Sequence, residues 1–255
     1  MPFPDYRSAM SKSCHDYRRL SARWRAVSRA AGIRLQTIAV ADDLPVFCLK
    51  SPALSLTGGI YLSAGIHGDE PGATEGLIAW AEERQSDLAA LPVVIFPCLN
   101  PWGLTMNRRS DSEGHDLNRL FHHDQHPTIV AVRKIVQLHR FSAALMLHED
   151  YDAEGVYLYE HRTTDAAGPH LLDAAEKVIP RDPRTRIDGR RAKNGLLNPR
   201  FSPQLFEKIG HPEAIWLHLH GSARSITFET PSEFALEQRA AAHLAVINRL
   251  VELCQ

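Results

Sequence analysis

Residues that could hold a metal ion occur in two separate places along the chain. His67 and Glu70 stand three residues apart in the segment 64–71, just before a stretch with helical spacing. An imidazole and a carboxylate at this spacing in a loop can converge on one cation, although the pair alone also fits a solvated loop. His148 directly follows the apolar run 143–147 and is the natural third ligand. Two histidines and one glutamate would leave a position open for water at a catalytic zinc ion.

A cationic stretch and a late carboxylate could complete this chemistry. Arg108, Arg109, Asn118 and Arg119 lie in one polar stretch. Guanidinium groups bind carboxylates with two parallel hydrogen bonds and can polarise a carbonyl oxygen, but a solvated charged loop explains the same residues on charge alone. Glu229 follows the apolar run 226–228, where it could act as a general base or simply be a charge at the end of a strand.

Other histidines have simpler explanations. His122, His123 and His126 lie in an unpatterned polar segment, and we expect them on the surface rather than in a second metal site. His218 and His220 alternate in a strand-like run, so packing in the core or at an edge explains them as well as function does.

Hydrophobic patterning predicts a mixed α/β sheet covered by helices on both faces. Strands are expected at 35–40, 45–49, 59–63, 93–98, 143–147, 155–159 and 226–229, with helices at 73–85, 129–138, 171–178 and 236–253. The first two strands would form an edge hairpin, and 181–200 would be a long surface loop bordering the site. Residues 1–34 would contain a helix docked on the domain, with apolar positions at Tyr17, Leu20, Trp24, Val27 and Ala31. No repeat or linker divides the chain, so we expect a single domain over residues 1–255.

Composition narrows the classes of partner. The chain has 29 Lys plus Arg and 30 Asp plus Glu, a net charge of -1, and this balance argues against nucleic acid as a partner. No apolar run is long enough to cross a bilayer, so no membrane is expected either. Four scattered cysteines without a CxxC pair favour reduced thiols and a cytoplasmic location.

Taken in order, the motifs HGDE, NPWG, NRR, DLNR, the histidine at 148 and FETPS resemble those of the zinc metallocarboxypeptidases related to carboxypeptidase A. They also resemble the succinylglutamate desuccinylase and aspartoacylase branch of that superfamily. The resemblance covers about Gly59 to Ser232. It implies a single mixed sheet flanked by helices, of the phosphorylase/hydrolase-like type, and one zinc ion per chain held by His67, Glu70 and His148.

The same resemblance implies a role for each of the other candidates. Asp116 would orient His67, which agrees with the general rule that a metal-bound histidine donates its other N–H to a carboxylate. Arg109, with Arg108 as the substitute, would polarise the scissile carbonyl. Asn118 and Arg119 would bind the terminal carboxylate of the substrate. Zinc would activate a water, and Glu229 would take its proton and deliver it to the leaving nitrogen.

Some residues depart from the family pattern. The family usually has a tyrosine on a loop shortly before the catalytic glutamate, but residues 215–221 contain none, and His220 or His218 could close over the substrate instead. Glu149 and Asp150, beside His148, are unusual and could support the site or compete for the role of base.

Three functions are compatible with these residues. The leading one is a carboxypeptidase that removes a C-terminal residue from a small or modified peptide, because the residues after Glu229 look like a single helix. The alternative is an N-acyl amino acid deacylase of the aspartoacylase kind, which the HGDEPGA version of the loop favours. The third is a metal-free binding protein that kept the fold and lost activity.

Overall fold

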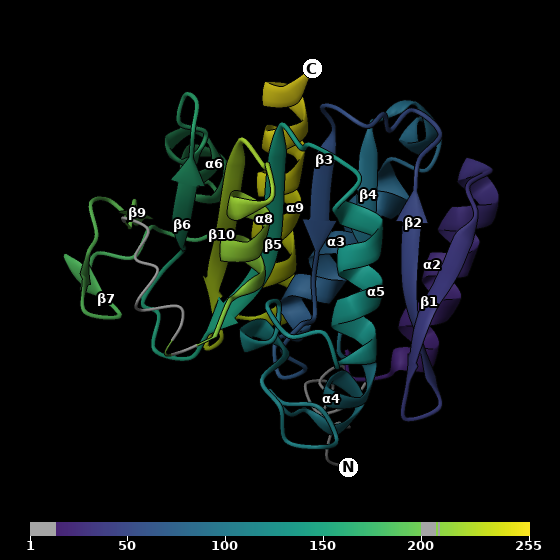
Figure 1. Ribbon diagram of the computed structural model, residues 1–255. Coiled ribbons are helices and arrows are strands. Elements are labelled where there is room, and N and C mark those ends of the chain that lie inside the picture. The colour runs from purple at the N-terminus through teal and green to yellow at the C-terminus, as the bar shows by residue number, and fades with distance from the viewer. Residues whose placement is uncertain (1–13, 200–207, 209) are drawn as a thin grey trace, which may run out of the picture.

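A mixed sheet of eight strands forms the centre of the protein (Figure 1). The computed structural model describes residues 14–199, 208 and 210–255. The strand order is β1-β2-β4-β3-β5-β10-β6-β9. The strands are β1 (Leu35–Ala41), β2 (Leu44–Lys50), β3 (Ile60–Ser63), β4 (Val93–Phe96), β5 (Ala143–Asp150), β6 (Tyr157–Arg162), β9 (Leu196–Leu197) and β10 (Arg224–Pro231). A separate small hairpin consists of β7 (Arg186–Ile187) and β8 (Arg190–Arg191).

The middle of the sheet is parallel and buried. β4, β3, β5 and β10 run in the same direction, and every residue of β3 and β4 is buried. Continuous apolar runs are typical of strands covered on both faces, which is why the sequence predicts these strands well. The expected edge hairpin is confirmed, since β1 pairs with β2 and with no other strand among the described residues. Asp42 and Asp43 both have positive φ at its turn, and Asp tolerates this conformation better than most residues.

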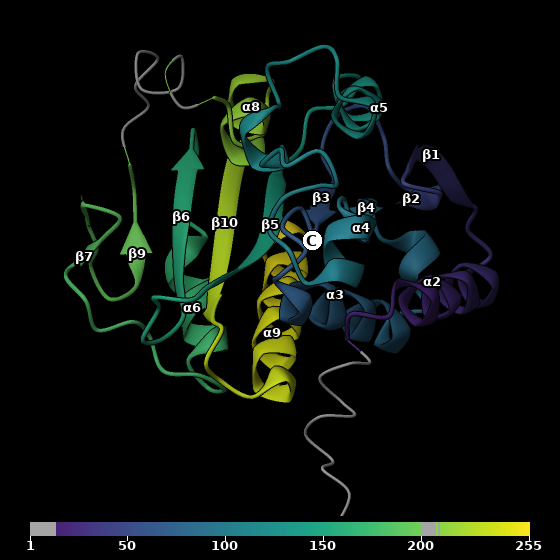
Figure 2. The same ribbon diagram turned by 90° about the horizontal axis from the view of Figure 1, so that it is seen from below.

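Helices cover both faces of the sheet, as expected (Figure 2). One face carries α2 (Tyr17–Ala31), α3 (Pro71–Glu83), α6 (Gly168–Ala175) and α9 (Leu236–Cys254). The other carries α5 (Pro127–Val136) and α8 (Glu213–Leu219). Shorter helices are η1 (Leu88–Ala90), α4 (Pro101–Met106) and η2 (Leu117–Arg119).

The predicted N-terminal helix is confirmed over the described residues, and 1–13 lie outside them. Tyr17, Leu20, Trp24 and Val27 of α2 are buried in the core. In the part of the chain that the structure describes, no helix combines the length and the apolarity needed to cross a membrane.

Two expected boundaries were wrong at the site. His148 lies inside β5, whereas the apolar pattern ended that strand at 147. Glu229, expected as the last residue of a strand at 226–229, lies inside β10, which continues to Pro231. The strands continue because β5 and β10 pair in parallel from Ala144 to Asp150, and this backbone pairing does not require apolar side chains. His148 and Glu229 are direct neighbours in the register.

Two other expectations also need correction. The run containing His218 and His220 is the helix α8 and its end, not a strand-like segment. Pro212 at the N-cap and Glu213 in the first turn are signals for the start of a helix. The expected loop 181–200 contains the short strands β7, β8 and β9 within its described residues.

The chain order around β3 creates a crevice for a site. The connection from β3 to β4 uses α3 on one face, and the connection from β4 to β5 uses α5 on the other face. Connections that leave on opposite faces open a crevice at the carboxyl ends of the strands, where α/β sheets bind their ligands. His67 follows β3 and His148 lies near the end of β5, so both are placed at this crevice.

Candidate active site

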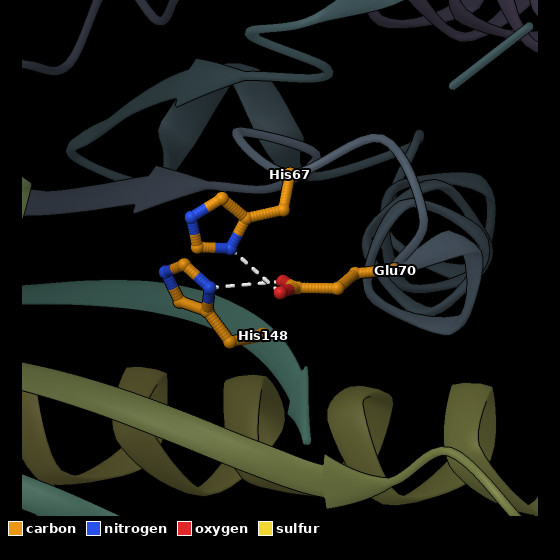
Figure 3. A group of neighbouring side chains, drawn as sticks. All are labelled: His67, Glu70 and His148. Carbon is orange, nitrogen blue, oxygen red and sulfur yellow. Dashed lines mark hydrogen bonds and ion pairs between the residues drawn. The ribbon is translucent and has the colours of Figure 1, made fainter. Parts of the chain in front are cut away.

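His67, Glu70 and His148 meet at the crevice (Figure 3). The Nδ1 atom of His67 lies 2.6 Å from Oε1 of Glu70, and the Nδ1 atom of His148 lies 2.9 Å from Oε2. All three side chains are buried. One donor atom from each lies within 4.8 Å of the others, and this is the one such group among the described residues. The structure therefore brings together the three residues that the sequence predicts as metal ligands.

The surroundings of this group favour a cation. Burial alone would lower the pKa of His67, but the carboxylates of Glu70 and Asp116 outweigh it and raise the pKa to about 9. Burial acts to raise the pKa of Glu70, yet the two imidazoles hold it well below its ordinary value. Glu70 also stands at the N-cap of α3, where the helix dipole favours a negative charge.

Two loops interlock to hold His67 in place. A Cβ atom on Gly68 would come within 1.9 Å of the backbone of Gly103, so the loop after β3 and the helix α4 touch through bare backbone. The Gly68 N–H donates to the carbonyl of Arg108 at 3.1 Å. Asn100 caps α4 through the Gly103 N–H, and its amide donates to the carbonyl of Arg109 at 3.3 Å. The HGDE and NPWG motifs thus fix each other and the start of the arginine loop.

Asp116 links His67 to Arg109. Its Oδ1 atom lies 3.2 Å from Nε2 of His67, on the side of the ring away from Glu70. Its Oδ2 atom accepts from Nη2 of Arg109 at 3.1 Å, and Nη1 of Arg109 is 3.6 Å from Glu70. The His67 side chain is therefore held between two carboxylates, one at each ring nitrogen.

Glu229 faces the same group from β10. Burial raises the pKa of this carboxyl, and Glu70 and Asp150 raise it further, while His148 opposes them. A carboxyl whose pKa is raised toward neutrality suits the uptake and release of a proton.

Asn118 and Arg119 line a cavity of about 290 Å³ together with Arg109, Glu229 and the three buried residues of the metal group. Asn118 uses its Oδ1 atom to accept from the Glu213 N–H at 2.8 Å, which leaves its amide N–H groups available. Arg119 uses one guanidinium nitrogen on the Asn118 carbonyl at 2.9 Å. Arg108, in contrast, is exposed and is not among the residues that line this cavity.

Comparisons with known proteins agree with this arrangement. Residues 57–151 match the family model of the succinylglutamate desuccinylase/aspartoacylase catalytic domain. No curated protein matches the chain. Among solved structures, a Shewanella amazonensis protein described as a metallopeptidase superposes with a TM-score of 0.83 at 21% identity, covering 94% of each chain. A metallo-carboxypeptidase from Burkholderia cenocepacia superposes with a TM-score of 0.69 at 15% identity, covering 92% of this chain and 68% of that one.

A murein-tripeptide amidase from Escherichia coli O157 also superposes, with a TM-score of 0.57 at 18% identity, covering 85% of this chain and 91% of that chain. The chain has the fold of these metallo-carboxypeptidases. Together with the match over 57–151, the fold indicates a hydrolase.

Three residues that the sequence did not predict for the site also line the cavity. Tyr157, Tyr159 and His161 project from β6 into the cavity. They alternate along the strand, and Tyr157 and Tyr159 pair in register with Glu229 and Thr227 of β10. A period of two in polar and aromatic residues was the available signal, since alternate residues of a strand share one face.

Both acidic residues beside His148 have partners within the protein. Glu149 points to the opposite face of β5, where Nη1 of Arg239 lies 2.7 Å from both of its oxygens. Asp150 faces the cavity, but its Oδ2 atom accepts from the Tyr157 hydroxyl at 2.9 Å. Glu149 is therefore not placed to compete with Glu229 as the base.

His220 does not close over the cavity. Its ring stacks on Trp216 with centroids 3.9 Å apart, and its Nδ1 atom lies 2.7 Å from the Trp216 carbonyl. Because Trp216 belongs to the core on the α5 side of the sheet, the imidazole is directed away from the metal group. His220 is not among the residues that line the cavity, and its contact with substrate stays a prediction.

Proposed function

We propose that the chain is a zinc-dependent carboxypeptidase that hydrolyses the amide bond before the C-terminal residue of a small or modified peptide. One observation carries the proposal. A single cavity gathers the buried His67, Glu70 and His148, the carboxyl of Glu229 and the guanidinium of Arg119, which come from four separate parts of the sequence.

The donor set fits zinc. Two imidazole nitrogens and one carboxylate are a common ligand set of catalytic zinc sites, which keep a further position open. His67 and His148 each present Nδ1 to a different oxygen of Glu70, so the donors already converge. We propose one zinc ion per chain at this point. When bound, zinc supplies a Lewis acid for the amide carbonyl and for the attacking water.

The protein's own groups would move the proton and support the charge. Glu229 would take a proton from the attacking water and deliver it to the leaving amide nitrogen. Arg109, which already lies beside Asp116 and Glu70, would donate to the carbonyl oxygen as negative charge develops there.

Arg119 and Asn118 would fix the substrate through its terminal carboxylate. Arg119 has guanidinium N–H groups left after its bond to the Asn118 carbonyl, and Asn118 has its side-chain amide. A planar guanidinium orients a carboxylate as well as attracting it, and this orientation would bring the scissile carbonyl to the metal group.

A second candidate function is an N-acyl amino acid deacylase. The match of residues 57–151 to the succinylglutamate desuccinylase/aspartoacylase catalytic domain favours it. Both candidates cleave an amide beside a free carboxylate, so they share the roles given above and differ in the length of the acyl part.

A matched substrate panel tests both functions. Zinc-loaded protein is given an N-acyl dipeptide as the free acid, the same dipeptide as its C-terminal amide, and the corresponding N-acyl amino acid. The carboxypeptidase proposal expects turnover of the free-acid dipeptide and little of the amide. Activity confined to the N-acyl amino acid would favour the deacylase. Glu229→Gln should keep the metal and abolish turnover, and a variant active within a few-fold of wild type would contradict the role of Glu229.

We further propose that residues 1–255 act as one catalytic domain and that zinc is the resident ion. We also propose that the protein works in the cytoplasm on small substrates, without nucleic acid or membrane as a partner. The shared sheet supports the first point. The absence of a disulfide among the four cysteines, all of which lie in the described ranges, supports the location. Limited proteolysis that released two stable fragments would contradict the single domain.

A further inference from the structure

Three hydrogen-bond donors that line the cavity have no partner among the described residues. Arg190 of β8, His161 of β6 and Thr227 of β10 all line it. Within the described part of the chain, none of the three side chains has a hydrogen bond or ion pair. Thr227 pairs in register with Tyr159, and His161 lies two residues further along β6. The turn that precedes Arg190 contacts the same strand, because Asp188 accepts from the Tyr159 hydroxyl.

The acidic groups of the same region are already satisfied by the protein. Asp188 accepts from the Tyr159 hydroxyl at 2.6 Å, and Asp150 accepts from the Tyr157 hydroxyl at 2.9 Å. Burial lowers the pKa of His161 to about 4, so at neutral pH the imidazole is uncharged and offers one N–H donor. The groups available to bind a ligand are therefore mainly hydrogen-bond donors, and one of them, the guanidinium of Arg190, is positively charged.

The β7–β8 hairpin holds Arg190 in a defined place. Its turn residues Asp188 and Gly189 both have positive φ, and an Asp-Gly pair favours this tight turn. The Asp188–Tyr159 hydrogen bond ties the turn to β6, and the buried Ile187, which pairs with Arg190 in the hairpin, packs into a small apolar cluster. Arg190 therefore lies beside the cavity on a short hairpin that a hydrogen bond and apolar packing hold in position.

We propose that this region is a specificity subsite for a carboxylate-bearing side chain of the substrate, with Arg190 as the specificity-determining residue and His161 and Thr227 as supporting donors. The proposal rests on the proposed function, because it names the kind of residue that the cavity accepts next to the scissile amide. A carboxylate can take two parallel hydrogen bonds from a guanidinium, whereas a neutral amide presents one acceptor and its own donors. A basic side chain would face Arg190 and be repelled.

Substrate pairs that differ only in this group test the proposal. The values of kcat/KM are measured for N-acyl dipeptides ending in Glu and in Gln, and for N-acyl-Glu and N-acyl-Gln. Since hydrogen bonds to charged groups are the strong ones, we expect a preference for Glu of about 10- to 100-fold in the wild type. Arg190→Met should bring the Glu/Gln ratio close to one, and Arg190→Lys should restore part of it.

Arg191→Met is the matched control, because Arg191 is the exposed neighbour on the same strand and does not line this cavity. Its Glu/Gln ratio should equal that of the wild type. A wild-type ratio below about two, an unchanged ratio in Arg190→Met, or an equal loss in Arg191→Met would overturn the subsite.

A binding measurement separates this proposal from the proposed function. Calorimetric titration compares free L-glutamate with free L-glutamine on zinc-loaded protein and needs no turnover. Tighter binding of glutamate that disappears in Arg190→Met supports the subsite even if none of the substrates is hydrolysed. Equal binding of the two amino acids overturns it even if the protein is an active peptidase.

Discussion

Replacement of Asp116 by Asn should weaken metal binding without disturbing the fold around it. The Oδ1 atom of Asp116 meets Nε2 of His67 at 3.2 Å and also accepts from the Asn118 N–H at 2.9 Å. An asparagine keeps an oxygen at this position and is itself a good helix cap, so η2 should remain intact. The variant therefore changes mainly the charge beside His67.

The expected loss of metal affinity follows from the contacts of the two carboxylate oxygens of Asp116, one with Arg109 and the other with His67. In Asp116→Asn an amide N–H₂ would replace the oxygen that now accepts from Arg109 at 3.1 Å, so two donors would face each other. The imidazole of His67 would also lose the anion that favours its metal-binding orientation. Loss of such an outer partner typically weakens metal binding 10- to 100-fold, which corresponds to about 1.4 to 2.7 kcal/mol.

Competition between the protein and a chelator of known zinc affinity measures this change directly. In excess zinc, the metal-dependent gain in unfolding free energy should fall by the same amount, since binding to the folded state stabilises it in proportion to the logarithm of 1/Kd. Asp111→Asn is the control, because Asp111 contacts His115 and His126 but not His67. A Kd for Asp116→Asn within about three-fold of wild type would refute this reasoning.

Three further predictions concern other parts of the protein. Arg119→Ala should lower kcat/KM on free-acid substrates about 30-fold or more and cause little further loss on C-terminal amides, and equal losses on both would remove Arg119 from carboxylate binding. Arg239→Met should lower the unfolding free energy in urea by about 3 to 5 kcal/mol, because it leaves the buried Glu149 without its partner, and a loss below 1 kcal/mol would contradict a structural role for the pair. Burial and the nearby Arg239 lower the pKa of His243 to about 3, so below about pH 6.5 the unfolded chain binds a proton that the folded chain does not, and stability falls as pH decreases from there toward 3. His243→Phe should flatten that fall by up to about 1.4 kcal/mol per pH unit, and urea titrations of both proteins between pH 7 and pH 4.5 with parallel slopes would exclude this residue as the cause.

Much of the sheet could be predicted from the sequence because its central strands are buried on both faces. In a run such as Val93 to Phe96 every residue is apolar, so the hydrophobic run can be recognised directly in the sequence. The ends of β5 and β10 could not be found in this way, since the apolar runs stop while the backbone pairing goes on through His148 and Glu229. The hydrophobic pattern of a sequence indicates which side chains are buried. The length of β5 and β10, in contrast, is determined by backbone hydrogen bonds between the two strands, which the pattern does not show.

The parts of the candidate site that lie in short sequence motifs could be predicted. The parts that depend on which strands lie side by side could not. His67 and Glu70 are close in sequence, so their convergence follows from local geometry. Tyr157 and Tyr159 reach the cavity only because β6 lies antiparallel to β10 with Tyr157 opposite Glu229, and no local pattern specifies that neighbour. The segment around His220 misled because alternation over a few residues fits a strand and a short helix equally well.

The contact between Gly68 and Gly103 has a consequence for how the protein can change. A Cβ atom on Gly68 would collide with the backbone of Gly103 and Leu104, and one on Gly103 would collide with Asn100 and Arg108, so neither position accepts a side chain while the segment 100–108 stays in place. Mutational libraries that randomise only one of the two loops should therefore recover glycine at that position almost exclusively. New loop sequences should enter together as a matched pair, so the two segments would be exchanged between related proteins as one unit although more than thirty residues separate them in the chain.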